Sequence, residues 1–289
     1  MVNLAVIGAG YWGPNLIRNF SQVPRCEVKA IADLEEENLR KIANLYPRAR
    51  KTSLTSEVLK SHEIDAVVIA TTAETHYELA REALEAGKDV FVEKPLTLKV
   101  EDAKTLVRLA REGDRLLMVG HLLLYHPAIK KLKEYVDSGE LGDLYYVYST
   151  RVSLGQVRKS ENALWTFAPH DVYVVMYLLG EKPERVTATG ESYLREGVFD
   201  VAFIALHFPD NRLAHIHVSW LDPHKIRKTT LVGSKKMVVF DDTESAEKIR
   251  LYDKGIDYRP AFADYPESLS LRTGDIYIPK IDATEPLRL

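Results

Sequence analysis

The chain has 289 residues, of which 46% are hydrophobic and 28% are charged, with a formal net charge of −3 at pH 7. This length allows two domains with separate cores, and the composition is typical of a globular protein in water. The small negative charge gives no reason to expect nucleic acid as a partner, and no segment predicts a signal peptide or a membrane span. Cys26 is the single cysteine, which excludes an intrachain disulfide and fits a reducing cytoplasm.

The first predicted element is a buried strand over residues 4–7, which ends at a glycine-rich turn. Residues 8–13 read Gly-Ala-Gly-Tyr-Trp-Gly, and apolar residues at helical spacing follow them. Strand, Gly-x-Gly-x-x-Gly and helix together are typical of a dinucleotide site. Gly8 permits the tight turn, Gly10 lets a pyrophosphate approach the backbone, and Gly13 lets helix and strand pack closely. The helix N-terminus offers N–H groups to the phosphates.

A second apolar run, over residues 28–32, ends at Asp33, twenty positions after Gly13. A carboxylate at this place accepts hydrogen bonds from the adenosine ribose and repels a 2′-phosphate, which favours NAD over NADP. Arg40 and Lys41 lie too far along the following helix to reverse that preference. The alternative is a glycine-rich turn that binds nothing, but the context on both sides favours the cofactor site.

Up to about residue 120, short apolar strands alternate with amphipathic helices. This pattern predicts a doubly wound parallel sheet, a Rossmann domain over residues 1–120. After a helix at 127–137, longer alternating runs predict strands at 144–152, 202–208, 212–220, 229–232 and 236–240. We therefore predict a second, α+β domain over residues 121–289, with an open, mainly antiparallel sheet and one helical face.

Ligands of parallel sheets bind outside the carboxyl ends of the strands, where the sequence places Thr71, Thr72, Glu93 and Lys94. Lys94 is the strongest candidate for chemistry, because a lysine beside a dinucleotide can polarise or protonate a substrate oxygen during hydride transfer. The alternative is a surface lysine on a loop.

His170 is the second candidate, since an imidazole exchanges protons near neutral pH. Pro169 suits the first turn of a helix and Asp171 suits its N-terminal field, so we place His170 at a helix start. A purely structural histidine at that helix start is the alternative. The neighbouring Trp165 offers an apolar wall for a sugar ring.

The sequence resembles the Gfo/Idh/MocA oxidoreductases, the glucose–fructose oxidoreductase and inositol dehydrogenase family. The resemblance runs from Val2 to the C-terminus. It rests on the glycine motif, on Glu-Lys-Pro at 93–95, on Val-Gly-His at 119–121 with Tyr-His-Pro at 125–127, and on Trp-Thr-Phe-Ala-Pro-His-Asp at 165–171.

The resemblance implies a Rossmann domain and a second α/β domain whose large sheet serves oligomer contacts. It also implies a catalytic Lys94, an active-site His170, and Glu93 at the nicotinamide-side ribose. One departure is Thr166, where members usually carry an aspartate four residues before the histidine. An aspartate could charge-stabilise the imidazole, whereas a threonine only hydrogen bonds.

Substrate clues lie in the segment 151–165. Arg151 and Arg158 could bind phosphate or carboxylate bidentately, and a solvated loop is the alternative. This segment and residues 168–171 resemble relatives in nucleotide-sugar pathways, which oxidise the 3-hydroxyl of an N-acetylated UDP-sugar. His215 and His217 share one strand face, but no third ligand is near in the sequence, so we predict no metal.

We therefore predict a cytoplasmic homodimer or homotetramer, an NAD(P)-dependent dehydrogenase that transfers a hydride between a sugar or nucleotide-sugar CH–OH group and nicotinamide. The sugar is expected between the domains. Two alternatives stay open: a glycosidase that uses bound NAD transiently, and a non-catalytic dinucleotide-binding regulator. The predicted catalytic residues are Lys94 and His170. The predicted cofactor-binding residues are Gly8, Gly10, Tyr11, Trp12, Gly13, Asp33, Thr71, Thr72, His76, Glu93 and Lys94. The predicted substrate-binding residues are Arg151, Arg158, Asn162, Trp165 and His170.

Overall fold

The N-terminal part of the chain folds around a six-stranded, wholly parallel sheet. The computed structural model describes residues 1–155, 161–259 and 268–288, and it places the strands of this sheet in the order β3-β2-β1-β4-β5-β6. The strands are β1 (Val2–Ile7), β2 (Cys26–Ala32), β3 (Arg50–Thr52), β4 (Ala66–Ile69), β5 (Asp89–Val92) and β6 (Leu117–Val119). The predicted doubly wound sheet is confirmed.

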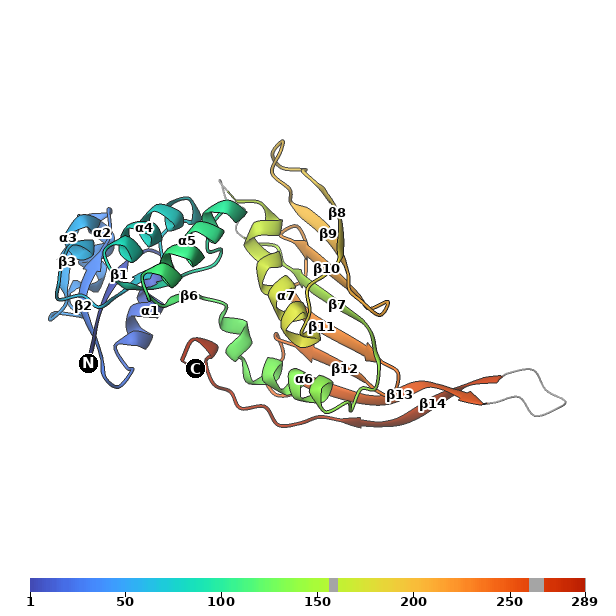
Figure 1. Cartoon of the computed structure of the whole chain (residues 1–289). Coiled ribbons are helices and arrows are strands. Elements are labelled where there is room, and N and C mark those ends of the chain that lie inside the picture. The colour runs from blue at the N-terminus through green and yellow to red at the C-terminus, as the bar shows by residue number, and fades with distance from the viewer. Residues whose placement is uncertain (156–160, 260–267, 289) are drawn as a thin grey trace. The chain divides into compact units, whose positions relative to one another are not determined.

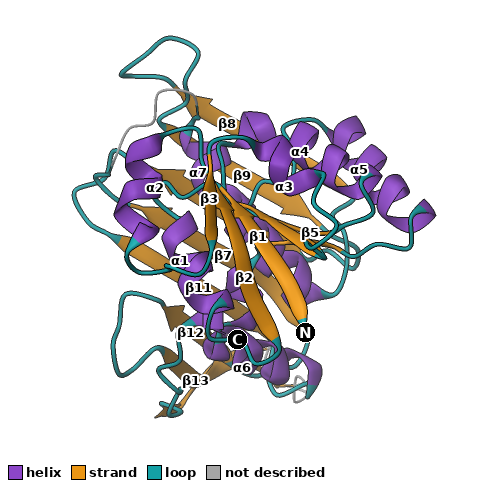
Figure 2. Cartoon of the chain, turned by 90° about the vertical axis from the view of Figure 1, so that its left-hand side faces the viewer, coloured by secondary structure: helices purple, strands orange, loops and turns teal. Residues whose placement is uncertain are grey.

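Helices connect these strands and cover both faces of the sheet (Figure 2). They are α1 (Gly13–Phe20), α2 (Glu36–Ala43), α3 (Thr55–Leu59), α4 (Ala73–Glu85) and α5 (Val100–Glu112). Because both faces are covered, the central strands are apolar runs without polar alternation, as in the buried stretch from Val67 to Ile69. The strand order reverses between β1 and β4, and ligands of such sheets bind at this reversal.

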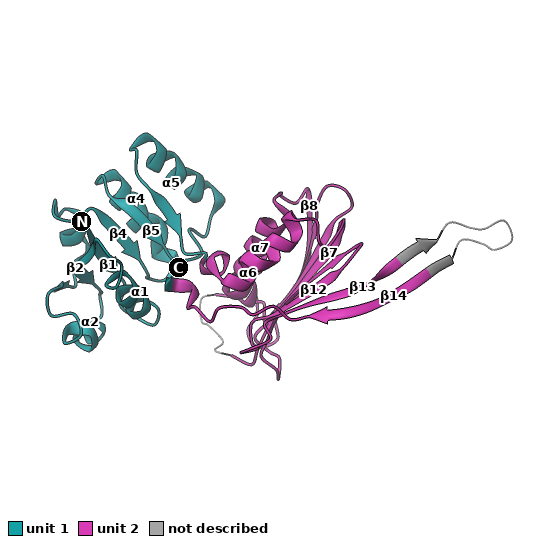
Figure 3. Cartoon of the chain, turned by 90° about the horizontal axis from the view of Figure 1, so that it is seen from below, with its two compact units in different colours: residues 1–121, 288 teal, residues 122–287, 289 magenta. Residues whose placement is uncertain are grey.

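The second compact unit, residues 122–287, is built on an eight-stranded sheet (Figure 3). Its order is β14-β13-β12-β11-β7-β10-β9-β8, and every ladder is antiparallel except that of β7 with β10. The strands are β7 (Leu144–Val152), β8 (Arg185–Glu191), β9 (Val201–His207), β10 (Leu213–Ser219), β11 (Ile226–Gly233), β12 (Met237–Asp241), β13 (Ile249–Arg259) and β14 (Ser268–Tyr277). This confirms the predicted open, mainly antiparallel sheet.

Two helices, α6 (Pro127–Asp137) and α7 (Ala163–Leu179), lie against one face of this sheet (Figure 1). Short 3-10 turns occupy Leu122–Tyr125 and Pro286–Arg288. The core between helices and sheet includes Leu132, Leu178 and Ile216, each fully buried. No helix in the described ranges is long and apolar enough to cross a membrane. The oligomer stays a prediction.

The helix that carries His170 begins earlier than predicted. α7 starts at Ala163, and the Asn162 side chain caps it by accepting the Trp165 N–H at 2.9 Å. Pro169 lies inside the helix, so the prediction that it occupies the first turn is wrong. A proline there removes one intrahelical hydrogen bond. The apolar side chains of α7 that pack on the sheet stabilise the helix on both sides of Pro169 and offset this loss. His170 therefore lies near the middle of α7.

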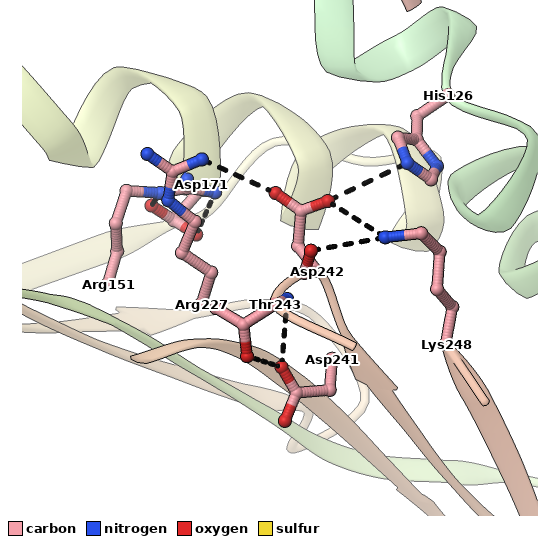
Figure 4. A network of polar contacts seen from close by, with 8 residues as sticks. All are labelled: His126, Arg151, Asp171, Arg227, Asp241, Asp242, Thr243 and Lys248. Atoms are coloured by element: carbon pink, nitrogen blue, oxygen red, sulfur yellow. Dashed lines mark hydrogen bonds and ion pairs between the residues drawn. The ribbon is translucent and has the colours of Figure 1, made fainter. Parts of the chain in front are cut away.

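At the start of α6, His126 caps the helix and faces a polar network (Figure 4). Its Nδ1 accepts the Ala128 N–H at 3.0 Å, and its Nε2 lies 3.7 Å from Asp242 Oδ1. Asp242 also faces Arg227 at 3.6 Å and Lys248 at 3.7 Å. Burial lowers the pKa of His126; Asp242 opposes this shift. Because Nδ1 accepts the Ala128 N–H, the cap requires the imidazole in its neutral form.

We expect His126 to make the fold less stable in mild acid. Its folded pKa lies below the ordinary value of 6.5, so the unfolded chain takes up the proton first. The neutral His126 contributes stability above pH 6.5, and this contribution is lost as the pH falls through the lower pKa of the folded state. His126→Asn keeps a capping oxygen that does not titrate. Its melting temperature should fall less than that of the parent between about pH 7.5 and about pH 5. Equal falls in thermal melts of the two proteins would contradict this assignment.

Candidate active site

The glycine turn after β1 is so tight that two of its glycines are required by the chain itself. Gly8 has a φ of +97°, and a Cβ on it would lie 2.7 Å from the carbonyl carbon of Ala70. A Cβ on Gly13 would lie 2.0 Å from the Gly8 oxygen. Gly10 differs, because the nearest atom to its Cβ position is Asn38 Nδ2 at 4.0 Å. Packing leaves space at Gly10, as the approach of a pyrophosphate requires.

Asp33, which follows β2, is bound to the same turn. Its Oδ2 accepts the Ala9 N–H at 2.6 Å, and its Oδ1 accepts from Glu35 N–H at 2.8 Å and from Asn38 Nδ2 at 3.2 Å. A carboxylate has roughly four acceptor directions, so capacity for a ribose hydroxyl is left. Asn38 is a residue of the candidate site that the sequence did not point to. Its position five residues after Asp33, in the first turn of α2, is the signal that could have found it.

Trp12 joins the glycine turn to the end of β5. Its indole Nε1 donates to Glu93 Oε1 at 2.8 Å, and Glu93 Oε2 accepts the Lys94 N–H at 3.3 Å. Burial raises the pKa of Glu93, while the Trp12 hydrogen bond and the Lys94 amide and charge lower it. Gly120 makes room for this carboxyl, since a Cβ there would lie 2.9 Å from Glu93 Oε1.

His121 is a further member of this group that was absent from the predicted site. Burial lowers the pKa of its imidazole, and the charge of Lys94 lowers it further. The ring is therefore neutral near pH 7. In the sequence, His121 contributed only to the family resemblance. The parallel pairing of β5 with β6 brings His121 near Lys94, and the sequence does not show that pairing.

The loops after β4 and β5 meet at His76, a residue of α4 that is only 1% exposed. Its Nδ1 lies 2.7 Å from the Pro95 oxygen and its Nε2 lies 3.2 Å from the Thr71 oxygen. Thr71 also pairs its hydroxyl with that of Thr75 at 2.7 Å, and Thr72 is the N-cap residue of α4. Contacts of the cofactor with these residues stay predictions. The same holds for Tyr11, which is exposed.

In the second unit, Arg151 forms a buried ion pair with Asp171, the residue after His170 (Figure 4). Arg151 Nε donates to Asp171 Oδ2 at 2.6 Å, Nη2 donates to Oδ1 at 3.3 Å, and the Ser149 hydroxyl donates to Oδ1 at 2.7 Å. Burial opposes the charge of Arg151, but the attraction of Asp171 outweighs it and raises the pKa. Substrate binding by Arg151 stays a prediction, and its guanidinium already holds α7 to β7.

The other predicted substrate residues are distributed as follows. Asn162 is committed to the cap of α7, and Trp165 is 39% exposed on the first turn. Thr166 donates to the carboxylate of Glu161 at 3.1 Å. Arg158 lies outside the described residues.

The two histidines of β10 lie on the same face of the sheet as Phe203 of the neighbouring strand β9. Phe203 stacks on His217 with ring centroids 4.4 Å apart, and on His215 at 6.2 Å. In the part of the chain that the structure describes, no three His, Cys, Asp or Glu side chains gather as metal ligands.

The sheet order and the glycine turn define the first unit as a dinucleotide-binding Rossmann domain. Residues 2–121 match the family model described as "Oxidoreductase family, NAD-binding Rossmann fold". Residues 129–239 match the model of the GFO/IDH/MocA C-terminal domain. The chain belongs to the GFO/IDH/MocA oxidoreductase family, which confirms the resemblance seen in its motifs.

Two curated relatives align over most of the chain. Myo-inositol 2-dehydrogenase of Thermotoga maritima is 25% identical over an alignment of 299 positions, gaps included. The alignment covers 99% of this chain and 90% of the relative. The 2,7-anhydro-N-acetylneuraminate hydratase of Escherichia coli is 27% identical over 271 residues, covering 87% and 70%. Of three further curated relatives, the chain spans 61%, 60% and 65% of the length.

Among solved structures, the UDP-N-acetylglucosamine 3-dehydrogenase GnnA of Acidithiobacillus ferrooxidans has the same fold. It superposes with a TM-score of 0.80 at 22% sequence identity, covering 99% of this chain and 85% of that one.

We expect Gly10→Ala and Gly13→Ala to separate cofactor binding from folding. A methyl group at Gly10 meets no protein atom closer than 4.0 Å, so the melting temperature should hold. If a pyrophosphate lies against this turn, as predicted, the same methyl would overlap it, and overpacking of about 1–3 kcal/mol would lower NAD affinity roughly 5- to 150-fold. Gly13→Ala should instead lower the melting temperature, because its Cβ overlaps the Gly8 oxygen. Calorimetry and thermal melts measure both; unchanged NAD affinity in Gly10→Ala would count against the site.

We expect Asp171→Asn to destabilise the second unit strongly. It leaves Arg151 buried without its charge partner, which costs about 3–5 kcal/mol in comparable pairs. The matched control is Glu112→Gln, which breaks the exposed pair with Arg108 and should change stability little. Urea unfolding measures both. If Asp171→Asn changed only the affinity for substrate and left stability intact, Arg151 would be a ligand-binding group and the ion pair dispensable.

Proposed function

We propose that the protein is an NAD-dependent dehydrogenase that transfers a hydride between the CH–OH group of a sugar or cyclic polyol and nicotinamide. The observation that carries this proposal is the place of Lys94. Its neighbour Glu93 is hydrogen-bonded to Trp12 of the glycine turn, so Lys94 lies at the same sheet edge as the space at Gly10. A general acid–base group beside a dinucleotide is what hydride transfer from an alcohol requires.

The preference for NAD over NADP is supported by the surroundings of Asp33. The next residue, Leu34, is exposed and uncharged, so no cation adjoins the carboxylate at this point of the chain. Lys41 on α2 is paired with Glu37 at 2.8 Å. A 2′-phosphate at this point would face the Asp33 carboxylate, which repels it.

In this assignment the residues of the first unit would bind and orient the cofactor. Asp33 would accept hydrogen bonds from the adenosine ribose, and the turn from Gly8 to Gly13 would receive the pyrophosphate. NAD, when bound, supplies the hydride acceptor. Lys94 in its neutral form takes the proton of the substrate hydroxyl, and as an ammonium group it returns that proton in the reverse direction. The neutral ring of His121 adds no second positive charge beside it.

The class of substrate is supported by one relative of nearly full length. The Thermotoga maritima protein is named for oxidation of myo-inositol, a cyclic polyol. A nucleotide-sugar substrate rests on the sequence of residues 151–165 and stays the more specific prediction. His170, predicted from the family motif to share the proton transfer, belongs to the second unit and also stays a prediction.

A second candidate is a reaction in which bound NAD is reduced and reoxidised within each turnover. It is favoured by two relatives named 2,7-anhydro-N-acetylneuraminate hydratase, since adding or removing water involves no net oxidation. Such an enzyme would convert its substrate without accumulating NADH, and it would use the same cofactor residues.

We expect NADH to form when the protein is mixed with NAD and either myo-inositol or UDP-N-acetylglucosamine. The increase in nicotinamide absorbance measures this reaction. Lys94→Ala should lower kcat/KM by about 10²–10⁴-fold, the usual contribution of a general acid–base group, with NAD affinity retained. The control is Lys104→Ala, an exposed lysine of α5. Substrate conversion without NADH would favour the second candidate. Turnover of Lys94→Ala close to that of the parent would overturn the role of Lys94.

A further inference from the structure

Lys94 lies between two residues that are each held by a side chain from elsewhere in the first unit. On one side, the Glu93 carboxyl accepts the Trp12 indole N–H at 2.8 Å. On the other side, the Pro95 oxygen lies 2.7 Å from Nδ1 of His76. The backbone of the proposed acid–base residue is thus tethered both to the glycine turn and to α4.

His76 has a hydrogen-bonding arrangement that fits this structural task. It is 1% exposed, and both ring nitrogens face backbone carbonyl oxygens, which accept hydrogen bonds and do not donate them. A ring nitrogen that carries a hydrogen donates it to the carbonyl that it faces. The contact with Pro95, at 2.7 Å, is shorter than that with Thr71, at 3.2 Å, and we assign the proton to Nδ1 on this ground.

We propose that His76, which the sequence placed among the cofactor contacts, is instead a positioning residue for Lys94, and that it acts through its hydrogen bond to Pro95 without touching substrate or cofactor. The proposal rests on the proposed function in so far as it concerns turnover. Proton transfer needs heavy atoms within hydrogen-bond reach. A loosened Pro95 would therefore let Lys94 drift from the substrate oxygen while the glycine turn keeps its cofactor contacts.

Two amide substitutions separate the two contacts of the ring. The amide nitrogen of asparagine is bonded to Cγ, as Nδ1 is in histidine, so His76→Asn keeps a donor toward Pro95. In glutamine this nitrogen lies one bond further out, like Nε2, so His76→Gln keeps a donor toward Thr71. Glutamine is the better helix former of the two. If His76 only stabilised α4, His76→Gln would be the more active of the two variants. The proposal predicts the opposite, with His76→Asn the more active.

The expected result is a kcat for His76→Asn within about tenfold of the parent and a kcat for His76→Gln lower by about 10²-fold, the cost of a displacement near 1 Å. The KM for the polyol and the Kd for NAD should be alike in both variants. Equal losses of kcat, or a more active glutamine variant, would overturn the proposal.

Amide hydrogen exchange tests the tether without relying on activity. The segment 93–99 should exchange faster in His76→Gln than in the parent and at the parent's rate in His76→Asn. Residues 13–20 of α1 serve as the internal control and should exchange alike in all three proteins. Equal exchange of segment 93–99 in the three proteins would overturn the tether. If the parent shows no turnover, or Lys94→Ala matches it, the proposed function fails, and the exchange rates still decide whether His76 holds Pro95.

Discussion

The register of three parallel strands is the constraint on which the candidate site depends. Ile7 of β1 pairs with Ile69 of β4, and Ile69 pairs with Val92 of β5. The residues that follow these three, where the chain leaves the sheet, therefore lie side by side in one row. Within this row Gly8 comes so close to the loop after β4 that a Cβ on it would overlap the loop backbone. The glycine turn, the loop that holds Thr71 and the Glu93–Lys94 segment all start from this row.

Buried carboxyl groups then fix the residues beside the proposed chemistry. In the first unit, Glu93 is held by the Trp12 indole and immediately precedes Lys94. In the second unit, Asp171 is held by Arg151 and immediately follows His170. A buried carboxylate is costly unless it is hydrogen-bonded, so each can adopt few arrangements. The physical effect is orientation, because a side chain next to an anchored residue inherits a defined backbone position.

Local patterns in the sequence predicted much of this arrangement and failed where the decisive partner is distant. The glycine motif and Asp33 could be predicted as a cofactor site because such a site depends on spacing within one βαβ unit. The helix start at Pro169 was wrong because proline is read as a first-turn residue, whereas the Asn162 cap and packing on the sheet decide the true start. His121 was missed as a site residue because β5 and β6, which bring it near Lys94, pair across the intervening helix α5 rather than within a local motif.

The sequence by itself predicted the alternation of strands and helices in the first unit, the two sheet types, the dinucleotide motif and the family, since these follow from apolar periodicity and from short motifs. It did not predict β8, β13 or β14 of the second sheet. Only the tertiary structure decided the partners of the functional side chains. Trp12 became a donor to Glu93, 81 positions away, and Arg151 became the counter-ion of Asp171. The reason is physical: periodicity records which face of an element is buried, whereas a hydrogen bond depends on distances of a few tenths of an ångström that strand register and packing set.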